Sequence, residues 1–167
     1  YMYFNGNAAV PYNWLIGNHG DDFIYQGGTG NASLSGGRND DILVSANFNS
    51  ADEQKFVQMS GDGTNGSNWP NYDDSDSDIF IIMGGNQRVE IDDFDKDDRL
   101  FLGMENFSSV LFDYYDVKSD MTTFVFDDSS LKIDGLRELS LSEGWGGLNA
   151  LDVTDRDQYQ AVVASSY

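Results

Sequence analysis

Two aspartates that follow glycine- and asparagine-rich segments are the residues of this chain best suited to chemistry. Asp22 and Asp41 each come after such a segment and precede a short apolar run. Glycine takes positive φ at no steric cost, so these segments can turn sharply and direct their carbonyl oxygens toward one point. Calcium prefers carboxylate and carbonyl oxygens, about six to eight of them. The pattern therefore predicts binding of a hard cation.

A nine-residue repeat sets the spacing of these aspartates. Three units follow one another at residues 17–25, 27–35 and 36–44. Each unit starts with two small residues and has an aliphatic residue at its eighth position, and one extra residue, Gln26, separates the first two units. The sixth positions are Asp22, Ala32 and Asp41. A weaker copy at residues 8–16 has Asn13 at this position. The repeat matches the G-G-x-G-x-D-x-U-x pattern of parallel β-helices that bind calcium.

The period also predicts which aspartates meet. Two units would form one coil of about 18 residues, so every second unit stacks on the same side. Asp22 and Asp41 then lie side by side, where two carboxylates ~5 Å apart repel by roughly 3 kcal/mol at an effective dielectric of ~20. A calcium ion between them would convert that repulsion into ligation. The other side pairs Asn13 with Ala32, without a charge, so we expect one good site and one poor or empty site.

The segment after the repeats is polar and irregular, and then becomes strongly acidic. Residues 45–77 are predicted to be an inserted loop with one short strand near residues 56–59. Asp62, within this loop, is either a further ligand or part of a plain turn. Asp78 and Phe80 fit positions six and eight of a degenerate repeat. Acidic residues are usually just solvated, but those from Asp73 to Asp98 alternate with Ile and Phe at strand period, so we expect some to be ligands.

Ordinary β patterning follows residue 103. Strands are expected at residues 110–112, 122–126 and 131–133, with a hairpin turn at 127–130 between the last two. Residues 154–157 have the sequence of a helix capping box, which predicts a short C-terminal helix at 155–164. We therefore expect a single domain over residues 1–167, made of repeats (8–44), the inserted loop (45–77), closing repeats (78–102), and a β cap with a tail (103–167).

Composition excludes several classes of protein. The 167 residues include 29 acidic and 9 basic residues, a net charge of −20, yet 40% of the chain is hydrophobic. That apolar content argues against a disordered acidic tail. The charge argues against nucleic acid and anionic membranes as partners. Without cysteine there are no disulfides and no thiolate zinc sites. The longest apolar run, residues 79–83, is too short for a membrane span.

These motifs resemble the C-terminal regions of RTX, or hemolysin-type calcium-binding, proteins, as in serralysin proteases, mannuronan epimerase repeat modules and large bacterial adhesins. The resemblance rests on the nonapeptides from Gly17 to Val44 and on a closing block over residues 78–102, similar to the family's D-x-F, I-x-D-F and D-x-[IL]-x-L motifs. It covers about half of the chain. It implies an all-β fold, a parallel β-roll capped by antiparallel strands, that folds on calcium outside the cell.

The resemblance also implies a ligand set and a route of export. Asp22 and Asp41 match the family's ligand aspartates, and Asp78 and Asp93 match aspartates of the closing block. Backbone carbonyls would complete the shell, from Gly17, His19, Gly36 and Arg38. Export would use type I secretion machinery that reads an uncleaved C-terminal signal. Because Ala32 replaces a ligand and the inserted loop interrupts the repeats, the calcium ladder should be short.

The sequence suggests two classes of function and argues against a third. The first is a non-catalytic, monomeric calcium module that folds after secretion and stabilises or displays its parent protein. The second is a module that binds polysaccharide or a surface partner through exposed aromatic residues, with Trp14, Trp69, Tyr72, Trp145 and Tyr159 as candidates. The third, catalysis, is not expected, because the single histidine, His19, lies in a repeat turn with no nucleophile motif nearby.

Overall fold

The computed structural model describes residues 2–6, 12–28, 30–47, 54–62, 76–95, 97–103, 112–126, 128–134, 137–142 and 148–155. Within these ranges the chain is all-β, as predicted, and contains no helix. Consequently, no described segment is a helix that could cross a membrane.

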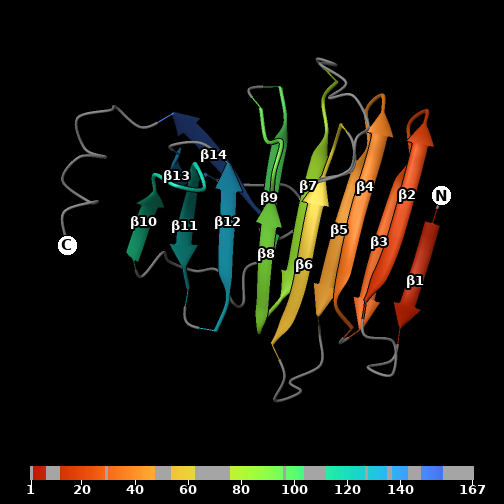
Figure 1. Cartoon of the computed structure of the whole chain (residues 1–167), viewed down its shortest axis with the longest axis horizontal. Helices are drawn as coiled ribbons and strands as arrows, with labels where there is room; N and C mark the ends of the chain where they lie inside the picture. Colours follow the sequence, from red (N-terminus) through yellow and green to blue (C-terminus); the bar gives the residue numbers. More distant parts are fainter. Residues whose placement is uncertain are drawn as a thin grey trace.

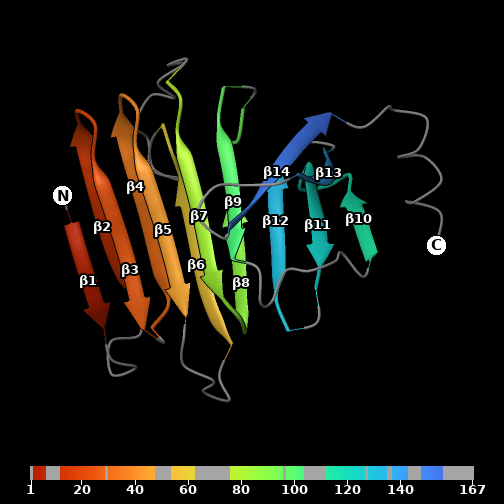
Figure 2. The same cartoon turned by 180° about the vertical axis from the view of Figure 1, so that it is seen from behind.

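The strands form two seven-stranded sheets that face each other (Figures 1 and 2). In spatial order, sheet A contains β1 (Met2–Gly6), β3 (Phe23–Gly28), β5 (Ile42–Asn47), β7 (Ile79–Gly84), β9 (Arg99–Gly103), β14 (Leu148–Asp155) and β13 (Arg137–Ser142). Sheet B contains β10 (Phe112–Asp116), β11 (Met121–Val125), β12 (Ser130–Asp134), β8 (Gln87–Ile91), β6 (Lys55–Ser60), β4 (Ala32–Arg38) and β2 (Asn13–His19). Neither sheet closes on itself.

From β1 to β9 the chain alternates between the two sheets, so that strands two apart in sequence become parallel neighbours. Asn13 pairs with Ala32 in sheet B, and Phe23 pairs with Ile42 in sheet A. The predicted stacking of every second repeat unit is therefore confirmed. Each of these steps spans 19 residues rather than about 18, because Gln26 adds one residue; its side chain is buried and donates to the Gly30 carbonyl at 3.1 Å.

The segment predicted to be an inserted loop contributes a strand to the stack. Its expected strand is β6, which lies between β4 and β8 and buries Val57 and Met59 completely. The next predicted unit is also in register, since Phe80 pairs with Leu43 and Asp78 thus falls beside Asp41. The stack continues through this segment, whereas the sequence predicts an interruption.

The C-terminal strands combine parallel and antiparallel pairing. The hairpin predicted over residues 122–133 is present as β11 and β12. β12 pairs in parallel with β8, whereas β14 pairs antiparallel with β9. The strand expected at residues 110–112 is instead β10, at 112–116, while residues 110 and 111 lie outside the described residues. The predicted helix at 155–164 begins on the last residue of β14, and its remaining residues lie outside the described part of the chain.

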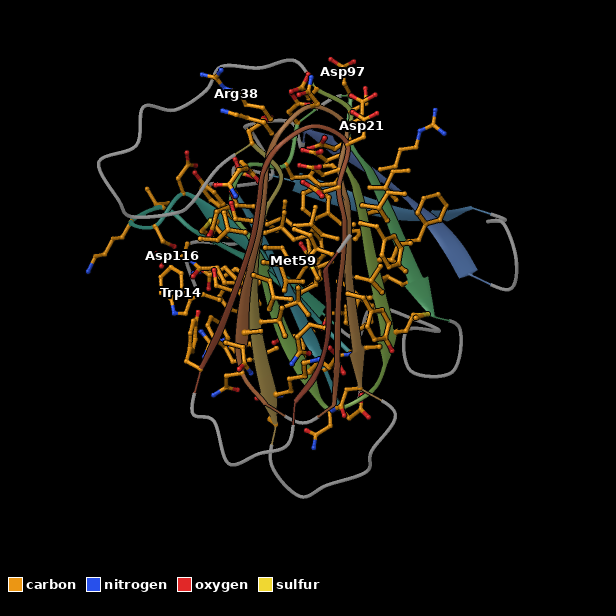
Figure 3. The ribbon with its side chains drawn as sticks, turned by 90° about the vertical axis from the view of Figure 1, so that its right-hand side faces the viewer. Trp14, Asp21, Arg38, Met59, Asp97 and Asp116 are labelled. Carbon is orange, nitrogen blue, oxygen red and sulfur yellow. The ribbon has the colours of Figure 1, made fainter. Side chains whose placement is uncertain are left out.

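Alternating side chains from the two sheets form one hydrophobic core. The largest apolar members are fully buried, for example Met59, which lies between the sheets in Figure 3. This alternation is the period-2 pattern of a strand with one face inward. The inward residues include Ile24, Leu43, Phe80 and Leu100 of sheet A and Leu34, Met59, Ile91 and Ile133 of sheet B.

A lysine is buried at one end of this core. Lys55, at the start of β6, is 0% exposed, and its Nζ donates to the backbone carbonyls of Ala46 at 3.0 Å and Gln26 at 3.3 Å. Because burial disfavours the charged ammonium, the pKa of Lys55 falls from 10.5 to about 7. No sequence signal marked this residue as internal.

Replacing Lys55 with Met tests this burial. Above pH 10.5 the lysine is neutral in both the folded and the unfolded chain, so its burial costs little free energy. As the pH falls toward 7, the unfolded chain takes up a proton that the folded chain does not, and the free energy of unfolding decreases. Relative to the variant, the wild-type chain should therefore lose about 4 kcal/mol of unfolding free energy between pH 10.5 and pH 7. Urea denaturation at several pH values measures this. Lys118→Met, at an exposed lysine, is the matched control, and equal pH profiles for the two variants would contradict the prediction.

Candidate metal site

Four aspartates form a column along the edge of sheet A, each just before a strand. This aspartate column consists of Asp22, Asp41, Asp78 and Asp98, which precede β3, β5, β7 and β9. Each carboxylate after the first accepts a hydrogen bond from the backbone N–H of the preceding member. The distances are 2.7 Å from Asp22 N to Asp41 Oδ1, 2.8 Å from Asp41 N to Asp78 Oδ1 and 2.9 Å from Asp78 N to Asp98 Oδ1. The predicted adjacency of Asp22 and Asp41 is thus extended over two further coils.

Glycines face the aspartate column from sheet B. This glycine column consists of Gly17, Gly36 and Gly61, in register across β2, β4 and the end of β6. A Cβ atom on Gly36 would lie 2.1 Å from Asp41 Oδ2, and one on Gly61 would lie 1.8 Å from Asp78 Oδ2. The carboxylates therefore fill the space that any larger residue would need. This close approach is the physical reason why the repeat places small residues before each aspartate.

Asp93 occupies the next position after the glycine column. Its Oδ1 accepts from Gly61 N at 3.0 Å, and its Oδ2 accepts from Asp62 N at 3.0 Å and from Ser60 Oγ at 2.7 Å. It therefore ties the coil that contains β8 to the coil that contains β6. Together with Asp62 and Asp98, it makes this end of the column the most acidic part of the site.

The turns that connect the two columns also stack on one another. Gly20 N donates to Asn39 Oδ1 at 3.2 Å, and Asn39 N donates to Asp76 Oδ2 at 2.6 Å. Gly20 and Asn39 both have positive φ, which glycine and asparagine tolerate. Figure 3 shows the labelled turn residues Asp21, Arg38 and Asp97 together at this end of the molecule.

Burial among like charges raises the pKa values of the aspartate column. Asp41 is 0% exposed, and its Oδ2 atom has no hydrogen-bond partner in the part of the chain that the structure describes. Burial, reinforced by the nearby aspartates, raises the pKa of Asp41 to about 6 and that of Asp78 to about 8, although each carboxylate accepts a backbone hydrogen bond that lowers it. The same causes raise the pKa of Asp98 to about 7, and burial with like charges raises that of Asp62 to about 8.

The predicted carbonyl ligands lie in the same region. Gly17 and His19 are on β2, and Gly36 and Arg38 are on β4, with His19 paired to Arg38. The His19 side chain is exposed, and the Arg38 carbonyl accepts a hydrogen bond from Gly20 N at 3.1 Å. These four residues therefore border the Asp22–Asp41 step of the aspartate column.

Asn13 and Ala32, predicted to form an uncharged second side, are neighbours at the opposite end of sheet B. The Asn13 amide donates to the Asn31 carbonyl at 3.2 Å. Sequence reasoning missed Lys55 at this end, and it missed Asp98 as a column member, although Asp98 begins the last motif of the closing block. Comparison with known proteins could not add to this picture, since neither family models nor curated proteins nor solved structures gave a match.

The columns do not form a preassembled side-chain metal cluster. Among the described residues, no three histidine, aspartate or glutamate side chains converge closely enough to hold a metal ion by themselves. The reason is geometric, because each coil contributes one carboxylate and one of its oxygens is engaged by a backbone N–H. An ion at these columns would therefore need backbone carbonyl oxygens as well.

The fit between the two columns can be tested by adding one methyl group. Gly36→Ala should destabilise the chain by about 2–3 kcal/mol, because its Cβ would overlap the Asp41 carboxylate. Gly103→Ala is the matched control, since a Cβ there would have no neighbour nearer than 3.4 Å. Urea denaturation compares the two variants. A Gly36→Ala chain as stable as Gly103→Ala would contradict the close approach.

The raised pKa values predict an unusual pH dependence for the calcium-free chain. A carboxyl group whose folded pKa exceeds its ordinary 3.8 favours folding when protonated, and this contribution is lost as the pH rises through about 6 to 8. The fraction of the chain that is folded in calcium-free buffer should therefore fall from pH 5 to pH 8. Far-UV circular dichroism measures this fraction. Lys55 acts in the opposite direction, so the Lys55→Met background isolates the aspartates. A folded fraction that rises toward pH 8 in that background would refute this origin.

Proposed function

We propose that the chain is a non-catalytic calcium-binding module of the RTX type, in which calcium binds along the aspartate column and drives folding of a parallel β-roll. Two features support it: a net charge of −20, and a line of four aspartates in which Asp41 and Asp78 are buried. Apart from calcium, we propose no cofactor.

The observation that carries this proposal is the free oxygen of Asp41. A fully buried carboxylate without a counter-charge is costly, and natural proteins normally pair such a group or coordinate a metal with it. Among the described residues Asp41 Oδ2 has no hydrogen-bond partner, and it points at the backbone of Gly36. Carbonyl oxygens are the additional ligands that calcium accepts and that the turns of Gly17, His19, Gly36 and Arg38 could supply.

The same chemistry suggests when the module would fold. Without calcium, the column repels itself and the folded state is weakened; with calcium, that repulsion becomes ligation. Extracellular modules bind calcium at ~10⁻⁴–10⁻³ M, so a chain of this kind would remain unfolded during export and fold outside the cell. We accordingly propose a secreted or cell-surface location, type I secretion and a monomeric state, with the module stabilising or displaying its parent protein.

Asp41→Asn provides the decisive experiment. The amide is nearly isosteric but uncharged, so the calcium-free variant should be as stable as the wild type or more stable, while the calcium concentration at the folding midpoint should rise by about tenfold or more. Far-UV circular dichroism and isothermal titration calorimetry measure both. Asp128→Asn, at an exposed aspartate on the β11–β12 turn, is the matched control.

The two readouts separate a ligand from a structural residue. If Asp41 only accepts the hydrogen bond from Asp22, the substitution lowers the stability of the calcium-free chain, and that loss accounts for any rise of the midpoint. Magnesium serves as a second control, because it prefers a small octahedral shell with retained waters and should replace calcium poorly. An unchanged midpoint for Asp41→Asn, or equal refolding by magnesium, would overturn the proposal.

A further inference from the structure

One line of side chains crosses the whole outer face of sheet B. The strand registers place seven residues opposite one another, one from each strand, and we call them the sheet B row. In order from β2 to β10 they are Trp14, Ser33, Gln58, Glu90, Lys132, Thr123 and Tyr114. With strands ~4.8 Å apart, the row spans roughly 29 Å. Figure 1 looks onto this face of the sheet.

The row has aromatic residues at its two ends. Trp14 is 64% exposed and Tyr114 is 46% exposed, and every other aromatic side chain whose burial the structure describes is buried or half-buried. Figure 3 shows Trp14 on the same side of the molecule as Asp116, the end of the strand that carries Tyr114. The neighbours of row residues on each strand, such as Leu34 and Val89, point into the core. The row is therefore an outward-facing feature, and its exposed aromatic rings do not contribute to the core.

The middle of the row is polar and electrically balanced. Lys132 Nζ lies 3.5 Å from Glu90 Oε1, so the row's two charged groups neutralise each other. Gln58 Nε2 donates to Asp92 Oδ2 at 2.8 Å, which leaves the Gln58 carbonyl oxygen as an acceptor. On the adjacent row, Arg88 covers the ring of Phe56 at 5.6 Å. Between its aromatic ends, the partly exposed members of the row offer hydrogen-bond donors and acceptors without net charge, whereas Thr123 is buried.

We propose that the sheet B row binds an uncharged, extended β-linked polysaccharide lying across the strands. Aromatic rings provide flat apolar platforms for the C–H faces of sugar rings, while amide, hydroxyl and carboxylate groups bind their hydroxyls. An extended β-linked chain advances per sugar by a distance close to the strand spacing, so successive sugars meet successive strands. The net charge of −20 disfavours acidic polymers, and the balanced row matches a neutral one. This proposal uses no residue of the aspartate column.

Binding to hydroxyethylcellulose and cellohexaose, by affinity electrophoresis and isothermal titration calorimetry, tests the row. The folded wild-type chain should bind both and should not bind cellobiose, which cannot reach both aromatic ends. Trp14→Ala and Tyr114→Ala should each weaken binding by about tenfold or more. Val117→Ala is the matched control, because Val117 is 66% exposed on the adjacent turn but lies outside the row. Circular dichroism establishes that each variant is folded.

The outcomes decide between occupants of this face. Binding of the neutral polymers that is lost in both aromatic variants and kept in Val117→Ala supports the proposal. Absence of binding to both neutral probes would overturn it, as would wild-type affinity in Trp14→Ala. Preferential binding of alginate that is lost in Lys132→Met would also overturn it, since the occupant would then be an acidic polymer. None of these results bears on the calcium midpoint of Asp41→Asn, so the two proposals stand or fall separately.

Discussion

The architecture depends on the contact between the aspartate column and the glycine column. Each carboxylate after the first accepts a hydrogen bond from a backbone N–H of the adjacent coil. These bonds fix the register between neighbouring strands to a single residue. The opposing glycines allow the carboxylates to lie where a side chain would otherwise be. A one-residue slip would break these bonds and turn the core residues outward, because side chains alternate along a strand. The same contact also buries like charges close together. The feature that specifies the fold therefore also introduces electrostatic repulsion that destabilises it.

The two ends of the core bury polar groups of opposite charge. At the aspartate end, carboxylates lie together, their pKa values rise, and Asp41 Oδ2 accepts no hydrogen bond from any residue that the structure describes. At the other end, the ammonium of Lys55 lies against the carbonyls of Gln26 and Ala46. The lysine end thus carries one fully buried ammonium, whereas the aspartate end carries several carboxylates beside the half-buried Arg38. This asymmetry is consistent with a proposed calcium requirement restricted to the aspartate end.

The two outer faces differ as much as the two ends. On sheet A, one outward row consists of Tyr25, Val44, Ile81 and Phe101 and is apolar. On sheet B, the corresponding outward row is polar between two exposed aromatic residues. The two outer faces can differ in this way because successive strands alternate between the sheets, so the outward side chains of each strand lie on only one outer face. A division of roles follows, in which the proposed ion site lies at the edge and the proposed polysaccharide site on a face.

The sequence by itself determined the repeating part of the fold. Its period predicted that Asp22 lies beside Asp41 and Asn13 beside Ala32. The resemblance carried by its repeats predicted an all-β chain, in which glycine turns and inward aliphatic residues recur at fixed spacing. The sequence could not show that β6 joins the stack, since the loops on either side of that strand carry no repeat. It could not place Lys55 in the core, because burial of a lysine depends on carbonyls distant in sequence. The sheet B row was likewise decided only by tertiary structure: its members come from seven strands, and register alone makes them neighbours.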